Sequence, residues 1–166
     1  MDNEIKLNLG CGNDVLPGWV NIDAYNDAAD VKADVRKLPY PDNSVDIILA
    51  SHVIEHFHFQ DGFAVLLEWY RALRPGGKLI VETPDFLATC KSFAEGSEGW
   101  RVDLYGQFFA QPWIPGQAHY FLYTETQLGG TLRQCGYRDV VRVPPESTYV
   151  KISGAHPLFL RMEAYK

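Results

Sequence analysis

The most constraining feature of the chain is a glycine-bearing turn that directly follows its first apolar segment. Ile5, Leu7 and Leu9 begin a strand-like run, and Gly10 and Gly12 end it abruptly. Glycine adopts positive φ without strain and carries no Cβ, so a ligand can lie directly on the backbone. In open α/β sheets, such a turn at the end of a buried strand is where nucleotide-like cofactors bind. A bare G-x-G is also common in ordinary turns, so it needs support from the rest of the chain.

Four further segments supply that support, in order along the chain. Each contains or follows a short apolar run; they are residues 20–23, 33–35, 44–52 and 73–81. Asp23 ends the second run, where a carboxylate can accept two hydrogen bonds from a ribose diol. Asp34 places another acidic group after the third run. The fourth run is almost wholly apolar, as expected for a strand covered on both faces. The order predicts a parallel α/β sheet with polar groups at its carboxyl edge.

Taken together, the five segments resemble the class I S-adenosylmethionine-dependent methyltransferases, most closely their small type 11 branch. Specific motifs run from about Lys6 to Asp85, and the resemblance continues more weakly to the C-terminus. It implies one α/β domain over residues 1–166. The expected fold is a Rossmann-like seven-stranded sheet of order 3-2-1-4-5-7-6, with an antiparallel last strand and helices on both faces. Pro17 and Gly18 interrupt the first connection, so the first helix should be shortened to one turn at most.

Periodicity and capping signals predict the other elements. The expected helices cover residues 61–73, 84–95 and 124–136, and the expected later strands cover residues 78–82, 137–143 and 158–165. Asp61 is the expected N-cap of the first of these helices, and Pro84 the expected start of the second. Thr124 and Gln127 have the spacing of a capping box. Gly136 is expected to close that helix.

Residues 96–123 stand apart from this regular pattern. They hold eight of the chain's 22 aromatic residues, among Gly and Pro breaks and with little periodicity. Two interpretations stay open for this segment. It can be a satellite core under a long connection, since such clusters are common. It can also be a lid or acceptor pocket, since long irregular loops in compact domains are usually functional.

The resemblance implies a set of cofactor-binding residues. They are Asn8, Gly10, Cys11, Gly12, Asp23, Ala24, Asp34, Val35, Ser51 and His52. Asp23 is expected to bind the ribose hydroxyls. Asp34 is expected to accept from the adenine amino group, with the Val35 N–H pairing a ring nitrogen. Ser51 ends a strand whose carbonyls face the ammonium group of the cofactor in the family. Asn8 stands where the family has an acid, and its amide oxygen can still accept from that ammonium.

Histidines at the expected mouth of the site are the catalytic candidates. Methyl transfer from a sulfonium releases a neutral thioether, so alignment of acceptor and methyl supplies much of the rate. A base is needed only where the acceptor carries a high-pKa proton. His52, His56 and His119 are the expected candidates for that role.

Residues 52–56 also match H-x-x-E-H, an inverted zinc-protease motif. The motif follows a methyltransferase-like strand, so its context argues against a protease. Some O-methyltransferases of this superfamily carry E-x-x-E-H here and hold a divalent ion. The sequence favours no resident metal, with Glu55 pairing locally and His56 packing near the cofactor. The alternative is a site of His52, Glu55, His56 and His119, which would suit zinc, iron or nickel better than magnesium.

Charge and composition limit the possible partners. The net charge of −6 makes nucleic-acid binding an unlikely role, since that needs basic surface. No apolar run approaches the length of a membrane span. Cys11, Cys90 and Cys135 lack disulfide or metal spacing, which predicts free thiols in a reducing cytoplasm. A homodimer is left open, because a second copy could complete the acceptor pocket.

The expected function is methyl transfer from S-adenosylmethionine to an O or N atom of a small or medium polar acceptor, such as a sugar or secondary metabolite. One alternative is a catalytically idle partner subunit with this fold. Another is a nucleotide-sugar or NAD enzyme. The missing third glycine and the missing phosphate-facing helix count against the last alternative.

Overall fold

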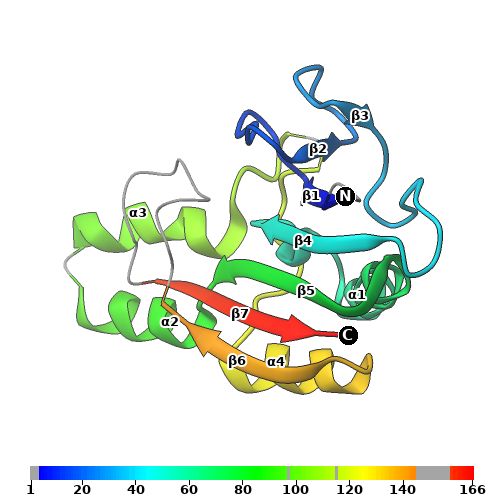
Figure 1. The fold of residues 1–166 in the computed structure, drawn as a ribbon. Coiled ribbons are helices and arrows are strands. Elements are labelled where there is room, and N and C mark those ends of the chain that lie inside the picture. Colours follow the sequence, from blue (N-terminus) through cyan, green and yellow to red (C-terminus); the bar gives the residue numbers. More distant parts are fainter. Residues whose placement is uncertain (1–3, 97, 115, 145–157) are drawn as a thin grey trace.

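The computed structural model describes residues 4–96, 98–114, 116–144 and 158–166. One sheet organises these residues, with helices and connections packed around it (Figure 1). The strands are β1 Lys6–Leu9, β2 Val20–Asp23, β3 Val31–Lys32, β4 Val45–Ser51, β5 Leu73–Pro84, β6 Arg138–Val143 and β7 Phe159–Tyr165. The helices are η1 Ile54–His56, α1 Phe59–Ala72, α2 Phe86–Glu95, α3 Glu98–Phe109 and α4 Glu125–Gln134.

The sheet order is β3-β2-β1-β4-β5-β7-β6, as the sequence predicts. The neighbours from β3 to β5 pair in parallel, and β7 pairs antiparallel with both β5 and β6. The parallel strands therefore all finish at one edge of the sheet. Strand β4 is flanked by β1 and β5, and its interior residues Leu49 and Ala50 are buried, which explains its continuous apolar sequence.

Two groups of buried side chains cover the two faces of the sheet. Ile48 of β4 belongs to the larger group with Leu66 of α1 and Leu132 of α4. Leu49, the next residue of β4, points to the opposite face and packs with Leu16. The connection between β1 and β2 contains turns and no helix, so Leu16 covers that face without one. This agrees with the expectation of one helical turn at most.

The starts of two helices differ from the sequence prediction. Helix α1 begins at Phe59 after His58, so Asp61 lies in its first turn and is not the N-cap. Strand β5 is longer than expected and takes in Pro84, which pairs with Phe159. Asp85 therefore caps α2, its side chain accepting from the Ala88 N–H at 3.1 Å. Helix α1 begins directly after His58, and α2 begins only after β5 has finished its pairing with β7. Local helix propensity does not reveal these starting points.

The expectation of little regular structure in residues 96–123 is wrong for its first half, which contains α3. Helices α2 and α3 lie side by side beyond the end of β5 (Figure 1). Phe93 of α2 meets Tyr105 and Phe108 of α3, with ring centroids 6.0 and 5.7 Å apart. The sequence of α3 has weak helical periodicity, because α3 is stabilised mainly by these aromatic contacts with α2. Residues 110–114 and 116–123 run back from α3 toward α4 and contain no helix.

Other local predictions are confirmed. Thr124 and Gln127 form both hydrogen bonds of the capping box at the start of α4. Gly10 and Gly12 have φ of +60° and +49°. Within the described ranges, every helix is too short or too polar to cross a lipid bilayer.

Candidate active site

A cavity of about 840 Å³ opens at the edge where the parallel strands finish. Its walls come from the turns after β1, β2 and β3, from the segment after β4, and from the loop after α3. Seven of the ten expected cofactor residues line it: Gly10, Gly12, Asp23, Ala24, Asp34, Val35 and His52. His56 lines it as well. The topology thus brings together residues that are widely separated in the chain.

Asp23 organises the floor of this cavity. Its Oδ2 accepts from the Gly12 N–H at 2.9 Å, and its Oδ1 accepts from the N–H groups of Tyr25 and Asn26 at 2.7 and 2.9 Å. One carboxylate therefore ties the glycine turn to the turn after β2. A carboxylate offers about four acceptor positions. The remaining one, on Oδ2, is available to a hydroxyl group in the cavity.

The glycine turn requires glycine at Gly10 on two grounds. Its φ of +60° is disfavoured for L-residues, and a Cβ there would lie 2.6 Å from Cγ2 of Val53. Val53 follows β4, so the glycine lets two strand ends approach closely. Gly12 has a similar φ, but among the described residues no atom beyond its chain neighbours lies within 4 Å of its Cβ position. The space above Gly12 belongs to the cavity.

Asp34 lies at the cavity rim and already has a cationic partner. The guanidinium of Arg36 donates to both carboxylate oxygens of Asp34, with its Nε at 3.0 and 2.9 Å. This hydrogen bonding keeps the pKa of Asp34 below its ordinary value. Arg36 is exposed and lines the cavity itself. It lies two residues after Asp34 and carries no distinguishing signal in the sequence.

Three expected cofactor residues do not line the cavity. Asn8 is buried, and its Nδ2 donates to the Asp14 carbonyl at 2.8 Å and to Oδ1 of Asn21 at 2.9 Å. Asn8 therefore holds the β1–β2 connection, with only its side-chain oxygen left for a ligand. The Ser51 hydroxyl donates to Oε1 of Glu82 at 3.2 Å.

Cys11 is the third of these residues. Burial, together with nearby carboxylates, raises the pKa of its thiol to about 11. The thiol is therefore protonated at neutral pH and is a packing group. Cys11, Cys90 and Cys135 are all free, in agreement with the sequence.

The histidines surround a buried glutamate. His52 has a left-handed backbone, with φ of +55°, and its Nδ1 lies 3.0 Å from Oε1 of Glu55. The Nε2 of His119 lies 3.9 Å from the same oxygen. The rings of His56 and His119 meet edge to face, with centroids 4.9 Å apart. His52 precedes η1 and His56 ends it, so the two do not share one helix face as a zinc-protease motif would require.

Burial and hydrogen bonding set the charges in this cluster. Burial alone would raise the pKa of Glu55, but the hydrogen bond from His52 and the adjacent imidazoles outweigh it and lower that pKa. Burial alone would lower the pKa of His52, but Glu55 outweighs it and raises that pKa. For His119, burial prevails and lowers the pKa below its ordinary value of 6.5. Glu55 is therefore ionised, and His119 is neutral at neutral pH.

The loop after α3 completes the cavity, which the sequence could indicate only as one of two alternatives. The cavity wall contributed by this loop consists of Ile114, Gly116, Gln117 and Tyr120. A Cβ on Gly116 would lie 2.8 Å from Cε2 of Tyr25, so the loop passes directly against that ring. Part of residues 96–123 thus faces the cofactor cavity and part packs on α2.

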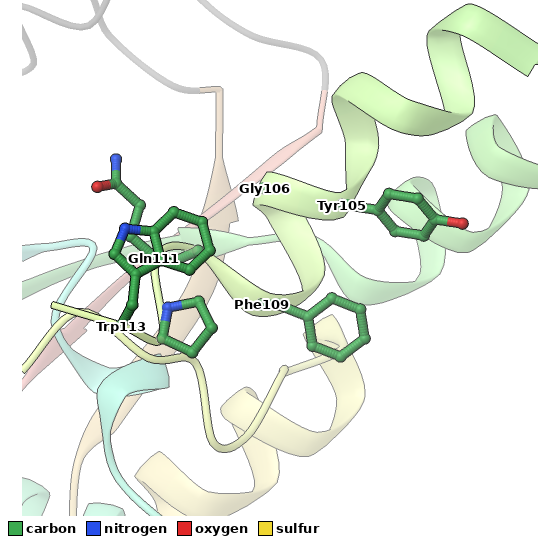
Figure 2. Close-up of a pocket in the computed structure, with 7 residues that line it drawn as sticks. Tyr105, Gly106, Phe109, Gln111 and Trp113 are labelled. Carbon is green, nitrogen blue, oxygen red and sulfur yellow. The ribbon is translucent and has the colours of Figure 1, made fainter.

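A second hollow, of about 630 Å³, lies beside the end of α3. Figure 2 shows Trp113 and Gln111 on one side of it and Phe109 and Tyr105 on the other. Trp113 is 77% exposed. Its walls hold no charged side chain and none of the expected site residues. The chemistry therefore belongs to the larger cavity.

An open sheet of this order, with a glycine turn and two acidic positions around a cavity at its carboxyl edge, defines the class I S-adenosylmethionine-dependent methyltransferases. The comparisons narrow this class. A family model for the type 11 methyltransferase domain matches residues 11–81. Residues 11–81 therefore match the type 11 domain, and the sheet has the class I S-adenosylmethionine-dependent methyltransferase fold.

Relatives and solved structures agree with this assignment. A probable S-adenosylmethionine-dependent methyltransferase of Mycolicibacterium smegmatis is 37% identical over 99 residues, covering 48% of this chain and 37% of the relative. Phosphoethanolamine N-methyltransferase of Triticum aestivum is 28% identical over 120 residues, covering 72% of this chain and 20% of the relative. The chain thus spans well under half the length of these relatives.

A crystal structure of an S-adenosylmethionine-dependent methyltransferase from Archaeoglobus fulgidus has the same fold. It superposes with a TM-score of 0.65 at 17% identity, covering 99% of this chain and 87% of that one.

Proposed function

We propose that the chain transfers the methyl group of S-adenosylmethionine to an oxygen or nitrogen of a small or medium polar acceptor. The observation that carries the proposal is the cavity itself, where the glycine turn, Asp23, Asp34 and His56 face one space. About 840 Å³ is within the usual range of small-molecule sites.

Each wall of the cavity has a role in binding the cofactor. The bare backbone at Gly12 leaves room for the methionine and ribose parts. The open acceptor position of Asp23 binds a ribose hydroxyl. Asp34 and the Val35 N–H bind the adenine edge, with Arg36 sharing the Asp34 carboxylate. Tyr25 is 74% exposed and borders the cavity, so its ring can cover the ribose or adenine.

The reaction needs position more than acid–base chemistry. The acceptor atom attacks the sulfonium methyl in line, the C–S bond breaks, and its electron pair stays on the sulfur as a neutral thioether. Holding acceptor and methyl together supplies much of the rate. If the acceptor is an alcohol, one proton must leave as the new bond forms. His56 lines the cavity, so that proton is released beside its imidazole ring.

Calorimetric titration with S-adenosylhomocysteine tests the cofactor site. We expect micromolar binding, about −8 kcal/mol at 1 μM. Asp23→Asn should weaken it at least about tenfold, because Asp23 holds both turns and the ribose position. Asp139→Asn is the matched control, since Asp139 is an exposed residue on β6 outside the cavity.

Two results would overturn the proposal. Folded protein that fails to bind at millimolar ligand would support the idle partner subunit. Displacement of S-adenosylhomocysteine by NAD would support the dinucleotide alternative.

A further inference from the structure

Three metal-ligating side chains converge beside the cofactor cavity. One ligand atom from each of Glu55, His56 and His119 lies within 4.8 Å of the other two. Two of these residues belong to η1, and His119 lies in the loop that follows α3. The cluster is therefore assembled by tertiary contact. His52, although part of the sequence motif, is not one of the three.

Both histidines of the cluster are oriented in the same way. The Nδ1 of His56 lies 2.9 Å from the Ala118 carbonyl, and the Nδ1 of His119 lies 3.1 Å from the Gln107 carbonyl. A carbonyl only accepts, so in the neutral imidazole Nδ1 carries the proton and Nε2 keeps its lone pair. Metal-binding histidines are held in this way, with the second nitrogen fixed by a backbone carbonyl. Edge-to-face packing of the two rings does not by itself require both Nδ1 atoms to bond to backbone carbonyls.

Glu55 provides the anionic ligand. Its side chain is fully buried, and within the described residues its Oε2 has no hydrogen-bond partner. His52 satisfies only Oε1. A buried, unpartnered carboxylate oxygen is costly, and a cation is the partner that would satisfy it best. His52 then acts as the outer group that orients the carboxylate.

The backbone makes the cluster rigid. The Glu55 carbonyl accepts from the N–H groups of Tyr120 and Phe121 at 2.8 and 3.2 Å. These bonds hold the loop that carries His119 against η1. A tetrahedral zinc site needs donor atoms about 3.4 Å apart, given bond lengths near 2.1 Å. The 3.9 Å between Glu55 Oε1 and His119 Nε2 is close to that spacing, and small side-chain rotations bring the set together.

We propose that Glu55, His56 and His119 bind one divalent ion of the zinc class. Two imidazoles and one carboxylate favour zinc, iron or cobalt over magnesium and calcium, which prefer all-oxygen sites. Three protein ligands leave a coordination position open. His56 lines the cavity, so an ion bound to it would lie at the cavity wall.

The catalytic use of the ion rests on the proposed methyl transfer. A bound ion would lower the pKa of an acceptor hydroxyl placed at the open position, as it lowers the pKa of bound water. The proton would leave to solvent through the cavity as the oxygen attacks the methyl group. The acceptor class is then a hydroxyl compound. His56 acts as a ligand and does not remove the proton itself.

Cobalt(II) titration of metal-stripped protein tests the site, because tetrahedral cobalt absorbs in the visible range. We expect one equivalent to bind with nitrogen and oxygen ligation, and zinc to displace it. Glu55→Gln and His119→Asn should each weaken zinc binding at least about tenfold. His58→Asn is the matched control for metal affinity, because His58 is exposed and outside the cluster.

Other results overturn the inference. Wild-type protein that gives no tetrahedral spectrum contradicts it, as does a thiolate charge-transfer band, which indicates adventitious binding at cysteine. Unchanged affinity in His119→Asn, or an equal loss in His58→Asn, contradicts it as well. Circular dichroism shows whether Glu55→Gln is folded, and if it is not, His119→Asn decides.

The metal site and the proposed function fail separately. Binding of S-adenosylhomocysteine is measured on the same metal-free protein. Cofactor binding without metal binding overturns only the inference drawn here. Metal binding without cofactor binding overturns only the proposed methyl transfer.

Discussion

Asp23 shows how one residue can prepare a site before any ligand arrives. Its carboxylate collects three backbone N–H groups from two turns, and both turns line the cavity. The same acid that the sequence assigns to ribose binding therefore also builds the floor on which the ligand would lie. Gly10 makes the complementary contribution, because its missing Cβ lets the end of β1 approach Val53.

The first prediction compares alanine at two glycines of the same connection. Gly10 and Gly18 both have positive φ, of +60° and +77°, but only Gly10 has a neighbour in the way. Gly18→Ala should lower the free energy of unfolding by about 1 kcal/mol through backbone strain. Gly10→Ala should lower it by about 2–4 kcal/mol, because the clash with Val53 adds to the strain.

Urea unfolding measures both costs, and titration with S-adenosylhomocysteine measures affinity. The affinity should fall only in Gly10→Ala. Equal losses of stability in the two variants would contradict the assigned clash.

At the scale of elements, α1 binds the chain segment that follows β3 and forms one wall of the cavity. The Trp69 indole is fully buried, and its Nε1 donates to the Val35 carbonyl at 3.0 Å. Glu68 accepts from the Leu38 N–H at 2.7 Å and from the guanidinium of Arg71. One helix therefore fixes a long irregular segment whose first residues line the cavity.

Trp69→Phe should destabilise the protein by about 2 kcal/mol, because it leaves the buried Val35 carbonyl unpaired. It should also weaken cofactor binding moderately, since Val35 lines the cavity. Trp113→Phe is the control, because Trp113 is 77% exposed. Chemical denaturation and ligand titration of the two variants provide the measurement. Similar effects in both would show that Trp69 does not position Val35.

Glu68→Gln should have a pH-dependent effect. The hydrogen bond from Arg71 lowers the pKa of Glu68 below its ordinary value of 4.5. A carboxyl whose pKa is lower in the folded state contributes its full stabilisation at a pH above its pKa in the unfolded state. That contribution is lost as the pH falls through its pKa in the folded state. At pH 7 the variant should be less stable than wild type by about 1–2 kcal/mol. The difference should shrink below pH 4.5. Urea unfolding over this range tests it, and a difference that grows toward acid would contradict the assignment.

At the scale of the whole molecule, the cavity joins parts of the chain that only the fold brings together. Walls from the turns after β1, β2 and β3, from the segment after β4 and from residues 116–120 meet around one space. A ligand that binds there contacts the sheet edge and the loop after α3 at once. It should therefore stabilise the complete domain.

A hundredfold excess of S-adenosylhomocysteine over its Kd should stabilise the fold by about 2.7 kcal/mol. For a chain of 166 residues this corresponds to a rise in Tm of roughly 5–10 °C. Differential scanning calorimetry measures it. Asp23→Asn, with at least about tenfold weaker binding, should show no more than about half of this rise at the same ligand concentration. A rise equal to that of the wild type would place the ligand elsewhere.

The amino-acid sequence by itself determined the apolar strands, the glycine turn and the polar carboxyl edge of the sheet, and its resemblance to the type 11 methyltransferases implied the sheet order. The strands and the polar edge follow from local signals: apolar runs, the glycine turn, and acids placed just after strands. Even the missing first helix follows locally, because Pro17 and Gly18 leave no room for it. The capping box at Thr124 is local in the same way.

Only the tertiary structure decided which polar side chains meet. Asn8 matches a ligand position in sequence, yet its amide nitrogen is bonded to Asp14 and Asn21. His119 lies more than sixty residues from Glu55, and their contact depends on how the loop after α3 packs against η1. The start of α1 and the presence of α3 depend on the same packing. Spacing along the chain carries no information on such contacts, because burial and long-range hydrogen bonds create them.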